Sequence, residues 1–443
     1  MKNVLKITLV VGILASFGFN IYPIDGYERT GIKRLYQIKK FHDDSIPYRR
    51  IPAGAYKSFK DIKLNLKSVS DSLSSILKED KEFSTKIKRI IPGGAYSAAV
   101  LDMSNPNDLK YAEHRENIGY QPGSVGKLAV LNALFTQLAR ICPDSWDDRM
   151  MYLKDIKVSS RYWGTGDHHT VPIYNIEEDK LTKRQVRATD EFSLFEWLDH
   201  MVSVSNNGAA SVLMRESMLM AAFNEKYIDL TEEEAEEYFK NTKRDSLTNL
   251  MHTVVNQPLR DLGITEDEWR LGGLFTRPAG KYVGRKGGSI GTPKGLMKFL
   301  VLLEQGKVVD EKTSLEMKRL LYLTDRRIRY AKSPRLDSAA VYFKSGSYYK
   351  CDREKNPNCA SYAGNVFNYM NSVIIVEHDD GVKYIVSLMS NVLNKNSAGA
   401  HMYLASKIDD VIKNNVDLPE VKEEPYKADD DEDDGNGAIG DGN

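Results

Sequence analysis

The hydrophobic pattern changes from strand type to helix type and back again along the chain. Strand-type segments are predicted at 95–103, 109–120, 339–346, 371–378 and 382–389. Between the second and third of them, a helical run starts at Ser124 and is apolar on nearly every side, so it should be a buried central helix. A closing helix is predicted at 400–413. This order predicts an α+β fold. Its antiparallel sheet is built from both ends of the domain, is flanked by helices and receives an inserted all-helical lobe.

Residues 142–300 are predicted to be mostly helical, with loops at 161–174 and 276–293. Within this region, the pattern indicates three particular helices. An amphipathic helix is expected over Ser193–Val204, a charged helix with a capping box over Thr231–Asn241, and a helix that begins at Thr292-Pro293. Helical periodicity is also present between Asp61 and Ile90, ahead of the first strand.

The chain divides into four parts by composition. Residues 1–22 combine two lysines with an apolar run and predict an export signal, so we expect a periplasmic or extracellular protein. If the signal is not cleaved, it would act as a membrane anchor. Residues 23–90 form an N-terminal extension, 91–413 the main domain, and 414–443 an acidic tail without core residues.

The charge balance bears on the binding partners of the protein, and the cysteine content bears on its disulfides. The 62 basic and 62 acidic residues cancel, which gives no indication of nucleic acid as a partner. Export permits a disulfide, and Cys351 and Cys359 bracket a polar loop where they could pair, although three reduced cysteines remain an alternative. Cys142 is expected to be a buried thiol. No metal or cofactor is predicted: His168-His169 follows Asp167 in a segment that we interpret as a solvated loop.

A Ser-x-x-Lys pattern supplies the first candidate chemistry. It places a hydroxyl and an amine one helical turn apart, so that a lysine held neutral can take the serine proton. The pattern occurs three times, at Ser75, Ser124 and Ser347. Only Ser124, with its partner Lys127, follows a predicted hairpin and a Pro-Gly break at the head of a buried helix, so context selects it.

Two further motifs support Ser124. Ser205-Asn206-Asn207 follows an amphipathic helix, where Ser205 could relay a proton and Asn207 could hold a substrate amide. Lys344-Ser345-Gly346-Ser347 lies on a predicted strand. There, Lys344 adds positive potential, the hydroxyls can bind a carboxylate, and Gly346 allows a substrate backbone to approach.

These three motifs, in this order, resemble those of the penicillin-recognising serine enzymes, which are the β-lactamases and the penicillin-binding D,D-peptidases. Ser205-Asn206-Asn207-Gly208 and the Thr292-Pro293 helix most resemble class A β-lactamases, over roughly 91–413. The resemblance implies that Ser124 is the acylated nucleophile and Lys127 its base partner. It implies that Ser205 relays the proton, that Asn207 binds the substrate amide, and that Lys344 and Ser345 bind its carboxylate. The backbone N–H groups of Ser124 and Ser347 would form the oxyanion hole.

One feature of class A enzymes has no clear counterpart. Those enzymes carry a glutamate four residues before an asparagine, which activates the deacylating water. Glu237 and Asn241 have that spacing but lie in a charged helix, whereas Glu266 and Glu268 are better placed but lack the asparagine. The leading prediction is therefore a class A β-lactamase-like serine hydrolase acting on β-lactams or peptidoglycan-like small molecules. The alternatives are a slowly deacylating D,D-peptidase or esterase-like enzyme, and a non-catalytic cell-envelope binding protein.

Overall fold

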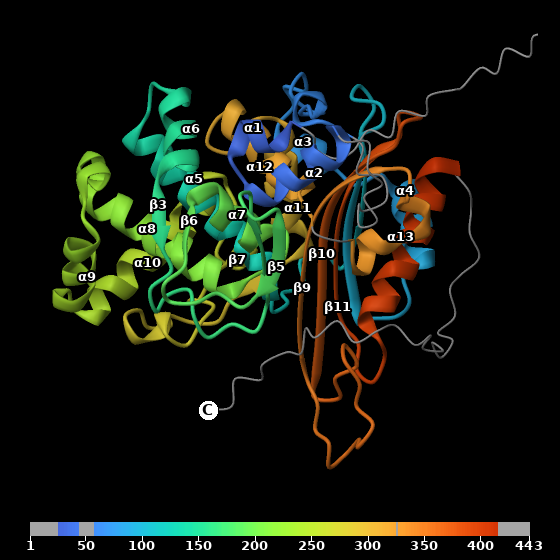
Figure 1. Cartoon of the computed structure of the whole chain (residues 1–443). Helices are drawn as coiled ribbons and strands as arrows, with labels where there is room; N and C mark the ends of the chain where they lie inside the picture. The colour runs from blue at the N-terminus through green and yellow to red at the C-terminus, as the bar shows by residue number, and fades with distance from the viewer. Residues whose placement is uncertain (1–24, 44–56, 325–326, 415–443) are drawn as a thin grey trace, which may run out of the picture.

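The computed structural model describes residues 25–43, 57–324 and 327–414 (Figure 1). The predicted export signal at 1–22 lies outside the described residues, as does the predicted acidic tail from residue 415 onward. Within the part of the chain that the structure describes, no helix is long and apolar enough to cross a membrane.

A five-stranded antiparallel sheet forms one side of the molecule, in the order β2-β1-β11-β10-β9. Its strands are β1 (Tyr96–Asp102), β2 (Lys110–His114), β9 (Ala340–Lys350), β10 (Phe367–Glu377) and β11 (Lys383–Asn391). The strands come from both ends of the domain, which confirms the predicted α+β architecture. Because β9 is an edge strand, one side of its backbone is left open beside the helical lobe.

Both faces of the sheet are buried, and the alternation of side chains divides them between two cores. On β11, Val386 and Leu388 pack with helices α4 (Lys81–Ile90) and α13 (Ser397–Asn414) on the outer face. Ile385 on the same strand points the other way, into the larger core shared with the helical lobe. The sheet is therefore the central layer between two sets of helices (Figure 1).

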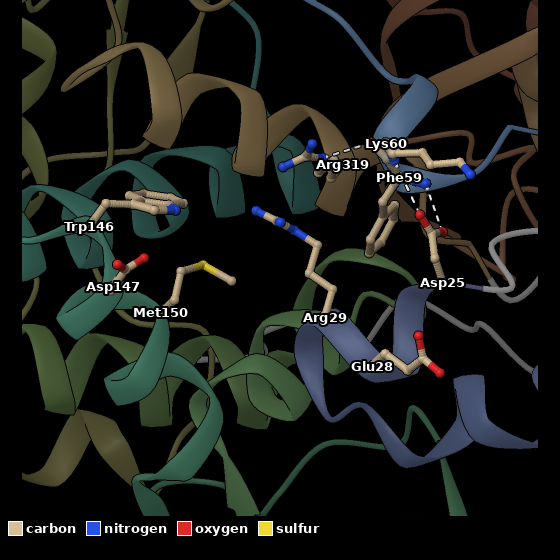
Figure 2. Close-up of a pocket in the computed structure, with 9 residues that line it drawn as sticks. All are labelled: Asp25, Glu28, Arg29, Phe59, Lys60, Trp146, Asp147, Met150 and Arg319. Atoms are coloured by element: carbon tan, nitrogen blue, oxygen red, sulfur yellow. Dashed lines mark hydrogen bonds between the residues drawn. The ribbon is translucent and has the colours of Figure 1, made fainter.

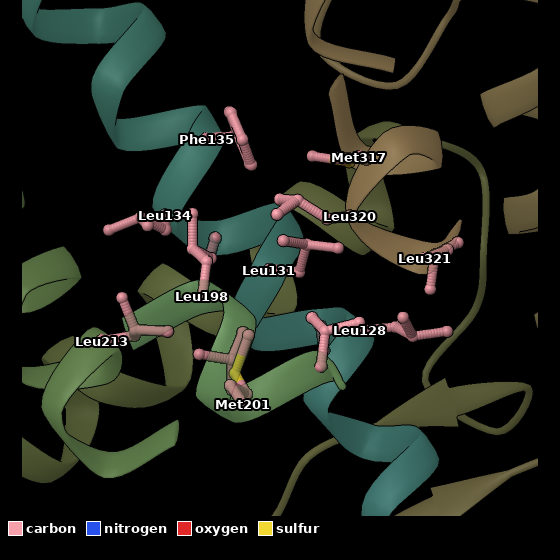
Figure 3. Close-up of a cluster of buried hydrophobic side chains, with 14 of the residues drawn as sticks. Leu128, Leu131, Leu134, Phe135, Leu198, Met201, Leu213, Met317, Leu320 and Leu321 are labelled. Carbon is pink, nitrogen blue, oxygen red and sulfur yellow. The ribbon is translucent and has the colours of Figure 1, made fainter. Parts of the chain in front are cut away.

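The helical lobe is built around α5 (Lys127–Ile141), which is buried nearly all round, as its sequence predicts. It packs against α8 (Asn207–Phe223), α7 (Leu194–Val202) and α10 (Arg244–Asp261). Figure 3 shows Leu128 and Leu131 of α5 between residues of α7 and of α12 (Glu311–Tyr322). This packing holds the start of α5, which directly follows the predicted nucleophile Ser124, in the core.

Outside α5, most of the predicted helices are confirmed and several segments differ. The predicted capping box begins α9 (Glu232–Asn241), α7 begins with a capping box that was not predicted, and α11 spans Pro293–Glu304. The region 142–300 also contains short strands that the pattern did not predict: β3 (Lys157–Ser159), β4 (Val171–Asn175), β5 (Lys180–Arg184), β6 (Glu191–Ser193), β7 (Trp269–Arg270) and β8 (Ile290–Gly291). These pair only two by two. Such short pairs lack the longer alternation that marks a strand in sequence.

The N-terminal extension packs on the main domain through buried ion pairs. Its described elements are α1 (Gly26–Thr30), α2 (Lys33–Asp43), the 3-10 turn η1 (Phe59–Asp61), α3 (Leu73–Ile76) and α4. The helical periodicity predicted between Asp61 and Ile90 is confirmed at α3 and α4, whereas residues 62–72 are not helical. Arg34 on α2 binds both carboxylate oxygens of the fully buried Asp199 at 2.5 and 2.7 Å. Removing one partner of such a buried pair costs about 3–5 kcal/mol, so the extension is part of the folded unit.

A surface cavity of about 530 Å³ lies where this extension meets α6 (Trp146–Asp155) and α12. Figure 2 shows Arg29 pointing into it, between Met150 on one side and Phe59 on the other. None of the residues that line it belongs to the predicted site.

The loop between β9 and β10 projects beyond the rest of the sheet (Figure 1). It is closed by a disulfide between Cys351 and Cys359, with Cα atoms 5.9 Å apart, so the paired alternative holds. Cys142 is a buried free thiol, as predicted.

Candidate active site

Ser124 lies in a tight turn that leads directly into the buried helix. The turn, η2 (Gly123–Gly126), is a 3-10 helix rather than the predicted first turn of an α-helix. Gly123 opens it with a φ of +52°, a conformation that favours glycine. In 3-10 geometry, side chains three residues apart eclipse each other. The Ser124 hydroxyl is therefore stacked over Lys127, the first residue of α5.

Lys127 joins the predicted residues into one hydrogen-bonded cluster. Its side chain is fully buried, and Nζ lies 2.8 Å from Ser124 Oγ, 2.6 Å from Asn207 Oδ1 and 3.4 Å from Ser205 Oγ. Lys344 Nζ lies 2.7 Å from the same Ser205 hydroxyl. Ser205 therefore bridges two lysines, which is the geometry that a proton relay requires.

The second motif is held in a strained turn between α7 and α8. Ser205 has a φ of +62°, uncommon for a residue with a side chain. Asn206 anchors the turn on both sides: its N–H donates to the carbonyl of His200, and its side chain caps α8 by accepting from Ala209 N at 2.7 Å. Because Asn206 provides the cap, the side chain of Asn207, the first residue of α8, faces Lys127 instead. Strain maintained by surrounding contacts is common at functional sites.

The third motif lies on the edge strand β9 against η2. A Cβ built on Gly346 would lie 2.6 Å from both Pro122 O and Ser124 N, so only glycine allows this approach. A Cβ on Gly123 would lie 3.3 Å from Ser347 N. The backbone amides of Ser124 and Ser347 therefore border the same narrow gap, in the arrangement expected of an oxyanion hole.

Replacing Gly346 by alanine should push β9 away from the Ser124 turn and disorder this gap. We expect the rate of Ser124 acylation to fall by about 10²–10³, the loss usual for a misplaced oxyanion donor, with about 1–3 kcal/mol of lost stability. Gly280→Ala is the matched control, since its added Cβ would meet nothing within 4 Å. Equal labelling rates in the two variants would contradict this role for Gly346.

Arg329 is a candidate site residue that the sequence analysis missed. It begins the 3-10 turn η5 (Arg329–Lys332) with a φ of +55°, and its guanidinium donates to Ser345 Oγ and Ser347 Oγ, both at 2.9 Å. No motif links it to the strand that it contacts, and only the folded structure brings it there. A guanidinium with two serine hydroxyls beside an open strand edge fits the binding of a carboxylate.

Burial and neighbouring cations lower the pKa values of Lys127 and Lys344. Burial, opposed by Asp167 and assisted by Arg329, lowers the pKa of Lys127 to about 7. Burial, with Lys127 and Arg329 nearby, holds the pKa of Lys344 well below its usual range. A lysine with a pKa near neutrality can accept the Ser124 proton at physiological pH.

None of the glutamates considered for deacylation contacts this cluster in the described part of the chain. Glu237 lies on α9 and accepts from Asn241, while Glu268 pairs with Lys298 at 2.5 Å and accepts from Thr265 N. The ring of Phe275 lies 4.9 Å from Lys127 Nζ. The described hydrogen-bond partners of the Lys127 amine are thus hydroxyl and amide oxygens, not carboxylates.

The segment 167–169 differs from the solvated loop that the sequence predicted. Asp167 is only 7% exposed and accepts from the backbone N–H of Asn207 at 2.6 Å and from its side-chain amide at 3.0 Å. His169 Nδ1 lies 2.8 Å from the same carboxylate. The expectation failed because Asp167 is buried against the start of α8, with His168 and His169 half-buried beside it, and local composition does not report this contact.

The fold, a five-stranded antiparallel sheet with a helical lobe, is that of the β-lactamase/transpeptidase-like superfamily. The chain matches the model of the beta-lactamase enzyme family over residues 82–412, and it belongs to that family. A search of curated proteins finds no significant match.

Among solved structures, many chains are similar. The TLA-3 extended-spectrum β-lactamase is 13% identical with a TM-score of 0.48, over 75% of this chain and 98% of that one. A representative class A β-lactamase from Bacteroides cellulosilyticus is 14% identical with a TM-score of 0.46, over 76% and 99%. A β-lactamase from Sphaerobacter thermophilus is 12% identical with a TM-score of 0.46, over 76% and 98%.

Proposed function

We propose that this protein is a serine enzyme that is acylated on Ser124 by β-lactams or related cell-wall-type amides and that releases the acyl group slowly. The observation that carries the proposal is the 2.8 Å contact between Ser124 Oγ and the buried amine of Lys127. A hydroxyl is a weak nucleophile until a base takes its proton, and this amine is the group placed to take it. We further propose that the protein acts outside the cytoplasm, where such substrates occur.

The proposed acylation follows from the contacts around Ser124. Lys127 takes the Ser124 proton as Oγ attacks the substrate carbonyl carbon, and the developing oxyanion is stabilised by the amides of Ser124 and Ser347. The proton then passes from Lys127 through Ser205 to the leaving nitrogen, and the C–N bond breaks. The substrate carboxylate is held by Arg329 with the hydroxyls of the third motif.

Slow release is proposed because a second step needs an activated water. In the described part of the chain, no carboxylate is hydrogen-bonded to Ser124 or Lys127, and the Phe275 ring lies 4.9 Å from the lysine amine. This favours the D,D-peptidase-like alternative over an efficient β-lactamase.

A chromogenic cephalosporin distinguishes these alternatives. The proposal predicts a burst equal to one equivalent of enzyme, followed by turnover at least about 10²-fold slower than the burst, since the loss of a general base costs 10²–10⁴. Steady rapid turnover without a burst would contradict slow release. No burst together with no labelling by a fluorescent penicillin or a fluorophosphonate would favour the non-catalytic binding protein.

A further inference from the structure

The loop that carries Asp167 is fixed against the helical lobe. The indole of Trp163 stacks on the ring of Tyr282, with centroids 5.1 Å apart and planes 7° apart. The Trp163 carbonyl accepts from Thr276 Oγ1 at 3.2 Å. A Cβ on Gly208 would lie 2.0 Å from the carbonyl oxygen of Gly164, so loop and α8 are in direct backbone contact. The position of Asp167 is therefore set by packing.

Asp167 reaches the first residue of α8 from this loop. Its side chain is 1% exposed, and its two oxygens accept from Asn207 N, Asn207 Nδ2 and His169 Nδ1. The N–H groups of a helix start, together with the helix dipole, favour a negative charge here. Consistent with these contacts, the pKa of Asp167 is lowered to about 2 against the opposing effect of burial.

This contact fixes which end of the Asn207 amide faces the catalytic lysine. An ionised carboxylate only accepts hydrogen bonds, so the NH₂ group of Asn207 must point to Asp167. The amide oxygen then points to Lys127 Nζ, 2.6 Å away. The second hydrogen of the NH₂ group remains for a substrate amide. Asp167 thus acts on Lys127 through a single intervening side chain.

Without the Asp167 carboxylate, the charged groups named around Lys127 would all be positive. Lys344 and Arg329 bring positive charge from β9 and η5, and Ser124, Ser205 and the Phe275 ring are neutral. On the loop, burial lowers the pKa of His169, so its imidazole is uncharged near pH 7. Asp167 is the negative group that opposes the two cations.

We propose that Asp167 is a positioning residue for the lysine base: it orients the Asn207 amide and supplies the buried negative charge that keeps Lys127 poised to exchange a proton near neutral pH. The catalytic part of this proposal rests on the proposed function, in which Lys127 is the base for the acylation of Ser124. It assigns to the 161–170 loop an electrostatic role that no motif of the chain indicates.

The test measures the titration of Lys127 directly, in full-length protein labelled with ¹³Cε-lysine. The signal of Lys127 is identified by its loss in Lys127→Arg. We expect its midpoint to fall by about one pH unit in Asp167→Asn, the size expected for one charge beyond an intervening side chain at an effective dielectric near 20. If a penicillin labels Ser124, the pH at which the labelling rate rises to half its maximum should also move to lower pH by the same amount.

Asp267→Asn is the matched control, since Asp267 is fully exposed and its replacement should leave the midpoint unchanged. If Asp167→Asn does not fold, Asp167→Ser serves as the second neutral variant. An unchanged or higher midpoint in a folded neutral variant would overturn the proposal. So would the failure of both neutral variants to fold while Asp167→Glu folds, because that pattern indicates a purely structural role. A lowered midpoint in a protein whose Ser124 is never labelled would support Asp167 and reject the proposed function.

Discussion

Replacing Ser124 by alanine is expected to abolish covalent labelling by penicillins and fluorophosphonates while leaving the fold intact. The residue lies in a 3-10 turn fixed by Gly123 and by the contact with Gly346, and neither contact uses the serine hydroxyl. Alanine therefore fits the same backbone. Ser205 is the hydroxyl nearest to substitute for it, but its Oγ lies between two lysines and has a different role in the relay.

Gel fluorescence after incubation with a labelled penicillin measures this loss, and thermal unfolding reports the fold. Ser75→Ala and Ser347→Ala test the other two Ser-x-x-Lys patterns. Ser75 is exposed on α3, so labelling should be unaffected there. At Ser347, the hydroxyl contacts Arg329, so the variant should still be labelled, at a reduced rate. Persistent labelling of Ser124→Ala would show that another residue is acylated.

Replacing Lys127 by methionine is expected to slow acylation by about 10²–10⁴, the contribution usual for a general base. Methionine fills the buried site with similar volume and removes the amine. Lys127→Arg tests the cause, because an arginine keeps the positive charge but cannot accept the proton. Both variants should lose acylation to a similar extent if the amine acts as a base.

The pH dependence gives a second measure of the same role. The pKa of Lys127 is lowered to about 7, so the amine is protonated and inactive as a base below pH 7 and neutral above it. The rate of Ser124 labelling should therefore rise with pH through a midpoint near 7, and this limb should be missing in Lys127→Met. A labelling rate in Lys127→Arg close to that of the natural protein would rule out the base role.

The sequence predicted the sheet, the central helix and most of the motif cluster because these depend on local signals. Strand alternation, capping residues such as Thr231 and the Pro-Gly break before Ser124 are all short-range features. In the structure, Lys127 contacts Ser124, Ser205 and Asn207, and Lys344 contacts Ser205. The remaining three residues of the third motif, Ser345, Gly346 and Ser347, follow Lys344 on β9, and Gly346 approaches Ser124. Where the prediction of local structure failed, as at the turn around Ser124, packing of β9 against η2 overrides the helical tendency.

The residues that sequence analysis missed are brought to the site by long-range folding. Arg329 reaches the third motif from η5, and Asp167 reaches Asn207 from a loop held in place by the stacking of Trp163 on Tyr282. Phe275 approaches Lys127 from a third segment. Each of these residues lies far along the chain from its partner, beyond the reach of the short motifs that indicated the other site residues.

Mass spectrometry of the intact protein after incubation with benzylpenicillin tests the central claim most directly. The account predicts one adduct per chain, with the mass of the whole penicillin added, which persists through buffer exchange and maps to the peptide that contains Ser124. An adduct on any other residue would contradict the account. So would the absence of any adduct when neither labelling nor turnover is detectable.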